Sequence, residues 1–252
     1  MTQGWPATRR GRPRPDWTAL ERWYRTPLGR RFARAEHTAL GYQLPWLFGH
    51  HLLSLGVPLE DDPLALSRIA HRCRVDFLPL HTPDLLADPL QLPIRSNSVD
   101  VIILSHLLEY TAEPHAVLRE VERVLIGEGH VLILGFNPAS LWGLGRLIGQ
   151  NRPPWDGHAL GPGRLRDWLS VLGLDIVALD RYFYRPPLAG EPLLERLDWL
   201  ERRGEHWWPF WGGGYLLTAR KRVFALTPIR PRWRPRRALV PGGSVGRCFH
   251  KD

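Results

Sequence analysis

Two spacings of hydrophobic residues divide the chain into expected strands and helices. Short apolar runs predict strands at 50–55, 99–104, 131–134, 174–179 and 215–221. Apolar residues three and four positions apart predict helices over 17–24, 26–44, 114–125 and 164–172. Strands that alternate with helices in this way predict an α/β fold with a mainly parallel sheet.

Two other regions carry weaker patterns. Between 59 and 91 we expect a helix over 63–69, a short strand over 72–77, and a strand end or loop over 84–88. The region 181–213 is rich in loops, with a short helix near 193–201.

Capping residues mark the expected helix ends. Asp16 can accept from the first free backbone amides of one helix. Thr26 followed by Pro27 starts the next, because proline suits the first helical position. Gly173 lies where a helix commonly ends on a left-handed glycine.

Composition separates a folded body from two basic ends. Residues 1–15 and 227–252 are rich in arginine and proline, which predicts a disordered arm and a disordered tail. Between them we expect an N-terminal helical cap over 16–48 and an α/β domain over 49–226, with 181–213 as an insertion.

The net charge of +9 lies in these ends, so the folded body is nearly neutral. Arginine-rich ends can bind nucleic acid or anionic lipid. A general compositional preference for arginine is the simpler explanation, because the chain has only two lysines, Lys221 and Lys251.

Several classes of protein are disfavoured. No apolar run is long enough for a membrane span, and the N-terminus lacks the apolar stretch of a secretory signal. Cys73 and Cys248 are the only cysteines, which favours a reducing, cytoplasmic location and gives no cysteine-based metal cluster. No carboxylate pair or Ser/His/Asp spacing favours a hydrolase.

The most specific pattern is the segment 92–135, which reads as turn, buried strand, loop, amphipathic helix, turn and buried strand. A leucine-proline turn and a serine/asparagine-rich turn precede a strand that starts at Asp100, and a proline-led helix ends on Arg-Val-Leu. This order resembles the class I S-adenosylmethionine-dependent methyltransferases of the type 11 branch, closely over 84–135 and by order of elements over 50–221. The resemblance implies a Rossmann-like, doubly wound seven-stranded sheet.

The resemblance also implies roles for four residues. Asp88 would bind the adenine amino group, Leu90 would pack on the adenine, and Ser105 would face the methionine moiety of S-adenosylmethionine. His106 is the candidate catalytic base, at the substrate mouth with Glu109 and Tyr110. Each has a purely structural alternative: a solvated turn aspartate, a core leucine, a serine bonded to its own backbone, and a structural histidine.

A second segment, 136–143, follows the strand at 131–134 and suggests a pocket. Asn137 can donate and accept hydrogen bonds, and Trp142 offers an aromatic wall, although Asn-Pro also opens ordinary turns. Further aromatic residues could line an apolar pocket or fill the core, namely Trp155, Trp207, Trp208, Phe210 and Trp211.

The chain departs from the family at the glycine-rich loop after the first strand. Of the three glycines only Gly56 is present, Pro58 and Glu60 replace the others, and Ser54 replaces the acid. Proline removes an amide donor and a glutamate brings negative charge toward a methionine carboxylate. Asp76 has roughly the separation needed to bind the ribose hydroxyls.

The sequence therefore favours a methyltransferase that binds S-adenosylmethionine and acts on a small or lipid-like acceptor, mainly through alignment of the reactants. Two alternatives stay open. The altered loop suits a methyltransferase-like binding module without activity, and the arginine-rich ends suit an RNA-directed methyltransferase.

Overall fold

The computed structural model describes residues 16–57, 63–77, 83–143, 153–186, 207–208 and 210–223. The expected arm at 1–15, the tail at 227–252 and the helix near 193–201 lie outside these residues, as does most of the 181–213 insertion.

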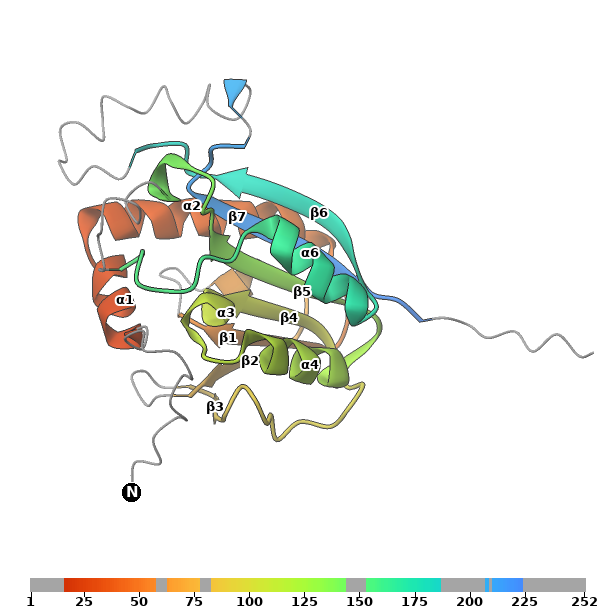
Figure 1. Ribbon diagram of the computed structural model, residues 1–252. Coiled ribbons are helices and arrows are strands. Elements are labelled where there is room, and N and C mark those ends of the chain that lie inside the picture. The colour runs from red at the N-terminus through yellow and green to blue at the C-terminus, as the bar shows by residue number, and fades with distance from the viewer. Residues whose placement is uncertain are drawn as a thin grey trace, which may run out of the picture.

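The described chain builds one seven-stranded sheet in the order β3-β2-β1-β4-β5-β7-β6 (Figure 1). The strands are β1 (His51–Gly56), β2 (His71–Asp76), β3 (Leu85–Leu86), β4 (Val99–Ser105), β5 (Leu125–Phe136), β6 (Leu174–Tyr182) and β7 (Gly214–Lys221). β7 is antiparallel to both of its neighbours, and the other adjacent pairs are parallel. The predicted Rossmann-like α/β fold is confirmed.

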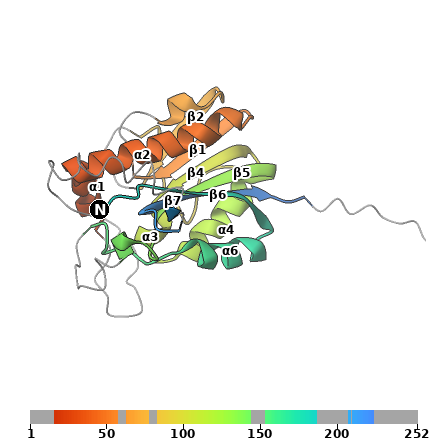
Figure 2. The same ribbon diagram turned by 90° about the horizontal axis from the view of Figure 1, so that it is seen from above.

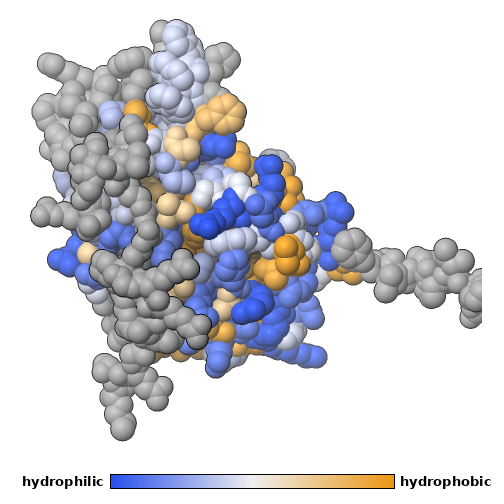
Figure 3. All heavy atoms as spheres, viewed as in Figure 1, coloured by the Kyte–Doolittle hydropathy of each residue, from blue (hydrophilic) through white to orange (hydrophobic). Residues whose placement is uncertain are grey.

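Helices cover both faces of the sheet (Figure 2). One face carries α1 (Trp17–Tyr24) and α2 (Pro27–Gln43), and the other carries α4 (Pro114–Val124) and α6 (Pro162–Val171). Ile103 of β4 packs toward α1 and α2, whereas its neighbour Ile102 packs toward α4 and α6. The strand reads as unbroken apolar sequence because both faces are buried. In Figure 3 mostly hydrophilic residues cover the outward side of α4 and α6.

The expected caps are present. Asp16 Oδ1 accepts from the backbone amides of Thr18 and Ala19, at 2.9 and 3.2 Å. Thr26 Oγ1 accepts from the amide of Gly29 at 3.1 Å, and Gly173 has the left-handed φ of +71°.

Side chains of the 92–135 motif hold the sheet together. Asp100 Oδ2 accepts from the amides of His50 and His51, each at 2.9 Å, and so ties the start of β1 to β4. Arg123 donates to the carbonyls of Leu92 and Ile94 at 3.1 and 3.0 Å, which fastens the leucine-proline turn to α4. These residues of the motif are structural.

Two elements differ from expectation. The turn expected between the helix at 114–125 and the strand at 131–134 lies inside β5, which starts at Leu125 and contains Gly127 and Gly129. Glu128 has a φ of +66° there, and the pairing with β4 is irregular between Val99 and Val101, so the expected turn is a bulge. The short helix α3 (Leu107–Tyr110) was not predicted, because all four of its residues are buried and leave no amphipathic period.

The connections that follow β1 and β2 lack the usual α-helices within the described residues. The expected helix at 63–69 is a 3₁₀ turn, η2 (Pro63–Leu66), and no helix is described between β2 and β3. α2 packs against η2, β6 and β7 and covers this face instead. Among the described helices none combines the length and hydropathy that a membrane crossing requires.

Candidate functional site

The residues singled out from the sequence lie where parallel strands end. β1 ends at Gly56, β2 at Asp76 and β4 at Ser105. The strand order changes direction between β1 and β4, because β2 and β3 lie on one side and β5 on the other. Ligands of open α/β sheets bind outside the carboxyl ends of the strands at such a point. We therefore call this edge the carboxyl edge.

Gly56 is required by a close approach between β1 and β4. Its φ is +110°, and a Cβ at this position would lie 2.1 Å from the carbonyl oxygen of Ser105. The amide of Val57 donates to that same oxygen at 3.1 Å. The space that glycine leaves is thus used by the protein's own backbone, and Pro58 and Glu60 lie outside the described residues.

We expect Gly56→Ala to lower the free energy of unfolding by about 1–3 kcal/mol, because alanine must take a left-handed conformation against a backbone oxygen. Gly41→Ala is the control. Gly41 lies in α2, where an added Cβ would meet only Leu66 Cδ1 at 3.7 Å. That variant should match the wild type or be stabilised by up to about 1 kcal/mol. Urea unfolding measures both, and equal stability of the two variants would contradict this role for Gly56.

Ser105 presents an unsatisfied hydroxyl at the carboxyl edge. The residue is 1% exposed, and its Oγ has no hydrogen-bond partner among the described residues. The alternative that the hydroxyl bonds its own backbone is therefore not what the structure has. Buried polar atoms are nearly always paired, so an unpaired one calls for a water or a ligand. Thr111 Oγ1 is in the same state close by in sequence.

Asp88 and Leu90 follow β3 at the same edge. Asp88 is exposed, and its Oδ1 accepts from the amide of Leu90 at 2.8 Å, which leaves its second oxygen outside that contact. Leu90 is half-buried against the core on the α4 side. Asp76 closes β2, and its carbonyl accepts from the amide of Ala87 beyond β3. An acidic residue therefore ends the second strand.

His106 lies at the centre of a buried polar network. The residue is 0% exposed and has a φ of +54°, which turns the chain from β4 into α3. Its Nδ1 lies 2.8 Å from Glu109 Oε2, and its Nε2 lies 2.6 Å from Glu36 Oε1. The hydroxyls of Tyr24 and Tyr182 donate to Glu36 at 3.1–3.2 Å.

The network changes the acidity of its members. Burial alone would lower the pKa of His106, but the charges and hydrogen bonds of Glu36 and Glu109 outweigh it and raise the pKa to about 9. Burial raises the pKa of Glu109 above its usual value, against the opposing effect of His106. His106 is therefore an imidazolium at neutral pH, with both nitrogens donating to carboxylates.

This arrangement bears on the chemistry expected of His106. A general base must offer a lone pair within reach of the substrate, and both nitrogens of this buried imidazolium already donate. Glu109 is the member of the network that lines a cavity, which lies beside the loop after β5. Its Oε1 accepts from the amide of Phe136 at 2.8 Å. The role of His106 in catalysis stays a prediction.

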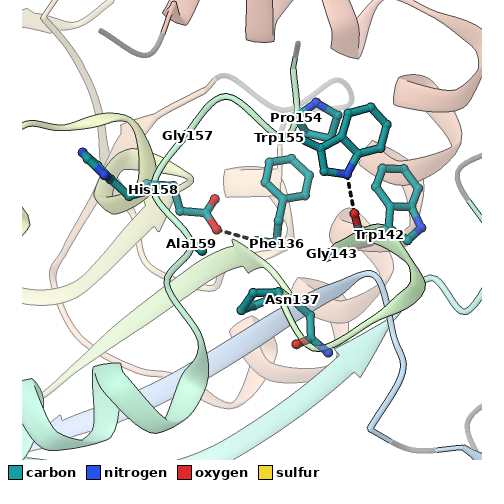
Figure 4. Close-up of a pocket in the computed structure, with 11 residues that line it drawn as sticks. Phe136, Asn137, Trp142, Gly143, Pro154, Trp155, Gly157, His158 and Ala159 are labelled. Atoms are coloured by element: carbon teal, nitrogen blue, oxygen red, sulfur yellow. Dashed lines mark hydrogen bonds between the residues drawn. The ribbon is translucent and has the colours of Figure 1, made fainter. Parts of the chain in front are cut away.

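A small cavity lies between the loop after β5 and the segment 153–159 (Figure 4). Phe136, Trp142 and Trp155 form its aromatic walls, and Glu109 and Asn137 are among its polar members. The indole nitrogen of Trp155 donates to the carbonyl of Trp142, as the dashed line in Figure 4 marks. The cavity volume is about 30 Å³, enough for a water molecule or two. A ligand larger than that would have to widen this cavity to enter it.

Asn137 is part of the cavity wall, as predicted for the segment 136–143. Its hydrogen bonds, however, are made to the protein's own backbone. Its Nδ2 donates to the carbonyls of Phe210 and Gly212, both at 2.9 Å. Its own amide donates to the carbonyl of Gly213 at 2.8 Å. The residue therefore fastens the segment before β7 to the end of β5.

The expectation that the late aromatic residues line a pocket or fill the core is wrong for four of the five. Trp207, Trp208, Phe210 and Trp211 line neither the cavity nor the core, since each is between 45% and 67% exposed. Only Trp155 of that set lines the cavity.

Comparison with known proteins gives the family. Residues 41–133 match the family model of a methyltransferase domain. The chain is 31% identical over 232 residues to the uncharacterized protein YafS of Escherichia coli (strain K12), covering 90% of this chain and 92% of that one.

Solved structures support the fold. One similar chain comes from the complex between the Haloferax volcanii Trm112 methyltransferase activator and its methyltransferase partner, with a TM-score of 0.59, 20% identity, and coverage of 84% of this chain and 100% of that one. Another is a SAM-dependent methyltransferase from Thermotoga maritima, with a TM-score of 0.58, 15% identity, and coverage of 82% and 100%. The chain belongs to the class I S-adenosylmethionine-dependent methyltransferases, in their type 11 branch.

Proposed function

We propose that this protein binds S-adenosylmethionine at the carboxyl edge and methylates a small or lipid-like acceptor. The observation that carries the proposal is the buried, unpartnered hydroxyl of Ser105 at the end of β4, beside Gly56 at the end of β1. β1 and β4 are the strands between which the strand order changes, where doubly wound sheets bind their ligands.

The side chains at this edge offer more contacts to the adenosine part of the cofactor than to its methionine part. Asp88 and Leu90 would hold the adenine, Asp76 the ribose hydroxyls, and Ser105 with Gly56 the methionine moiety. A helix N-terminus is a common site for a carboxylate, and the described residues after β1 hold only the turn η2. When bound, the cofactor supplies a methyl group on a positively charged sulfur, which leaves as a neutral thioether when the acceptor takes the methyl group.

Glu109, held in place by His106, would receive the proton that the acceptor releases. Glu109 faces the cavity, and its raised pKa makes it a better proton acceptor than an exposed glutamate. His106 would act as a positioning residue, because it holds one oxygen of Glu109 at 2.8 Å from within the core. The apolar walls of Phe136, Trp142 and Trp155 suit an acceptor with a hydrophobic part.

Binding of S-adenosylmethionine to Asp88→Ala tests this proposal. Loss of a hydrogen bond to a charged carboxylate should weaken binding about tenfold or more, as measured by calorimetry. Asp167→Ala is the matched control, because Asp167 is an exposed aspartate in α6, away from the carboxyl edge. It should bind like the wild type. Equal affinities of Asp88→Ala and the wild type would remove Asp88 from the site, and no heat from the wild type would reject the proposal.

A binding module without activity is the second candidate. It is favoured by the backbone contact that fills the space beside Gly56 and by the missing helix after β1 among the described residues. Conversion of S-adenosylmethionine to its demethylated product by the unaltered protein, with acceptors from a cell extract, would exclude it.

We also propose a cytoplasmic location, in keeping with the free thiol of Cys73.

A further inference from the structure

Four aromatic side chains stand out from the carboxyl edge between β6 and β7. Trp207, Trp208, Phe210 and Trp211 are 62%, 45%, 67% and 51% exposed. We call these four residues the aromatic loop. In Figure 1 residues 207–208 are the short blue segment at the top, beyond the ends of β6 and β7. Large exposed apolar groups gathered in one place usually mark an interaction site.

The aromatic loop is held in place by the protein. The amide of Trp211 donates to the carbonyl of Trp208 at 3.0 Å, which closes a turn. Asn137 fixes the carbonyl of Phe210 at 2.9 Å, and the guanidinium of Arg181 lies 5.2 Å from the centre of the Phe210 ring. The exposure therefore belongs to a supported segment that begins next to the cavity wall.

The chemistry of the aromatic loop suits the surface of a membrane. Tryptophan is favoured at the boundary of lipid and water, because its ring is apolar and its N–H can bond to polar headgroups. Arg181 places a positive charge against the ring of Phe210, and the two ends of the chain, outside the described residues, carry its excess of basic residues. Aromatic insertion together with basic charge is the combination that binds peripheral proteins to anionic lipid.

We propose that the aromatic loop docks the protein on an anionic phospholipid surface, with the carboxyl edge turned toward the lipid. The cavity then opens beside the bilayer through the wall that Asn137 shares with the loop. The acceptor class would be a lipid-like molecule resident in that surface. This last step rests on the proposed function, whereas docking itself does not.

Co-sedimentation of the full chain with vesicles tests docking. The vesicles are equimolar phosphatidylglycerol and phosphatidylcholine, or phosphatidylcholine alone, in a buffer of low salt so that charge attraction is retained. The loop variant replaces three exposed aromatic residues of the loop: Trp207→Ser, Phe210→Ser and Trp211→Ser. The control variant replaces three aromatic residues in the last turn of α2 and in the segment before β1, which are 66–76% exposed against 51–67% in the loop: Tyr42→Ser, Trp46→Ser and Phe48→Ser.

We expect the wild type and the control variant to sediment with the anionic vesicles. The loop variant should bind these vesicles with an affinity at least about tenfold lower. Binding to phosphatidylcholine alone should be weaker for all three proteins. If the loop variant bound the anionic vesicles as strongly as the wild type does, the proposal would be overturned and the arginine-rich ends would be the lipid-binding part. The proposal would also be overturned, in favour of a protein interface, if the wild type bound no vesicles but self-associated and the loop variant did not self-associate. Calorimetry with S-adenosylmethionine on the same samples reports the proposed function separately, because the loop variant should keep its cofactor affinity.

Discussion

Glu36→Ala is expected to lower the free energy of unfolding by about 3–5 kcal/mol. The carboxylate of Glu36 is 0% exposed and accepts from His106, Tyr24 and Tyr182. Its removal leaves a buried imidazolium with one carboxylate instead of two, and two buried hydroxyls without their acceptor. Removal of one partner of a buried ion pair lowers the free energy of unfolding strongly, because the remaining charge is not solvated.

Urea unfolding measures this loss at neutral pH. Arg34→Ala is the control, because Arg34 lies in the same helix and is exposed, so its replacement should change stability by less than about 0.5 kcal/mol. Glu36→Gln should lie between the two, since the amide keeps a hydrogen-bond acceptor and removes the charge. A Glu36→Ala protein as stable as the control would show that the network contributes nothing to the fold.

The stability of the protein should fall as pH rises from about 6.5 to about 9. The unfolded histidine has a pKa near 6.5 and His106 in the folded protein has one of about 9, so the folded state holds the proton more tightly. The stabilisation is complete below pH 6.5 and is lost as pH rises through the folded value. The shift corresponds to about 3 kcal/mol.

His106→Gln isolates this contribution, because glutamine does not titrate. Its unfolding free energy should be lower at pH 6 than that of the wild type and nearly flat up to pH 9. Tyr24 and Tyr182 have pKa values raised well above 10 by burial and by Glu36, so their effect appears only at higher pH. His130, whose pKa burial lowers, acts below the window. A wild-type profile as flat as that of the variant would contradict the protonated His106.

The strands and helices of the core were predictable because buried positions are occupied by hydrophobic residues at regular spacings in the sequence. The run at 99–104 is apolar on both faces, and the stripe of α4 repeats with helical spacing, so both were placed within one or two residues. The bulge in β5 was not, because it depends on a positive φ at Glu128 that no local pattern marks. The replacement of the helix expected at 63–69 by the 3₁₀ turn η2 was also hidden, since α2 covers that face from a distant part of the sequence.

The site was predictable in part for a similar reason. Gly56, Ser105 and Asp88 follow strands, so their place at one edge follows from the order of the strands. Glu36 was missed, although a signal existed. It lies between Phe32 and Leu40 at intervals of four, on the buried stripe of α2, where an acid is out of place unless it has a partner. Its partner His106 is 70 residues away, and only the folded chain brings the two together.

The exposed position of the aromatic loop could not be read from sequence either. A cluster of tryptophan and phenylalanine predicts burial by hydrophobicity alone. Asn137 and the turn at Trp208 instead hold these rings outward, and both contacts depend on the geometry of the ends of β5 and β7.

The central claim is that the carboxyl edge binds the methyl donor despite the altered glycine loop. A crystal structure of the protein with S-adenosylhomocysteine, the product of methyl transfer, tests it most directly. We predict ligand density over the ends of β1, β2 and β4, with Ser105 Oγ and the Asp88 carboxylate within hydrogen-bond distance of the ligand. Density elsewhere, or none at millimolar ligand with Ser105 Oγ bonded to a water, would contradict the claim.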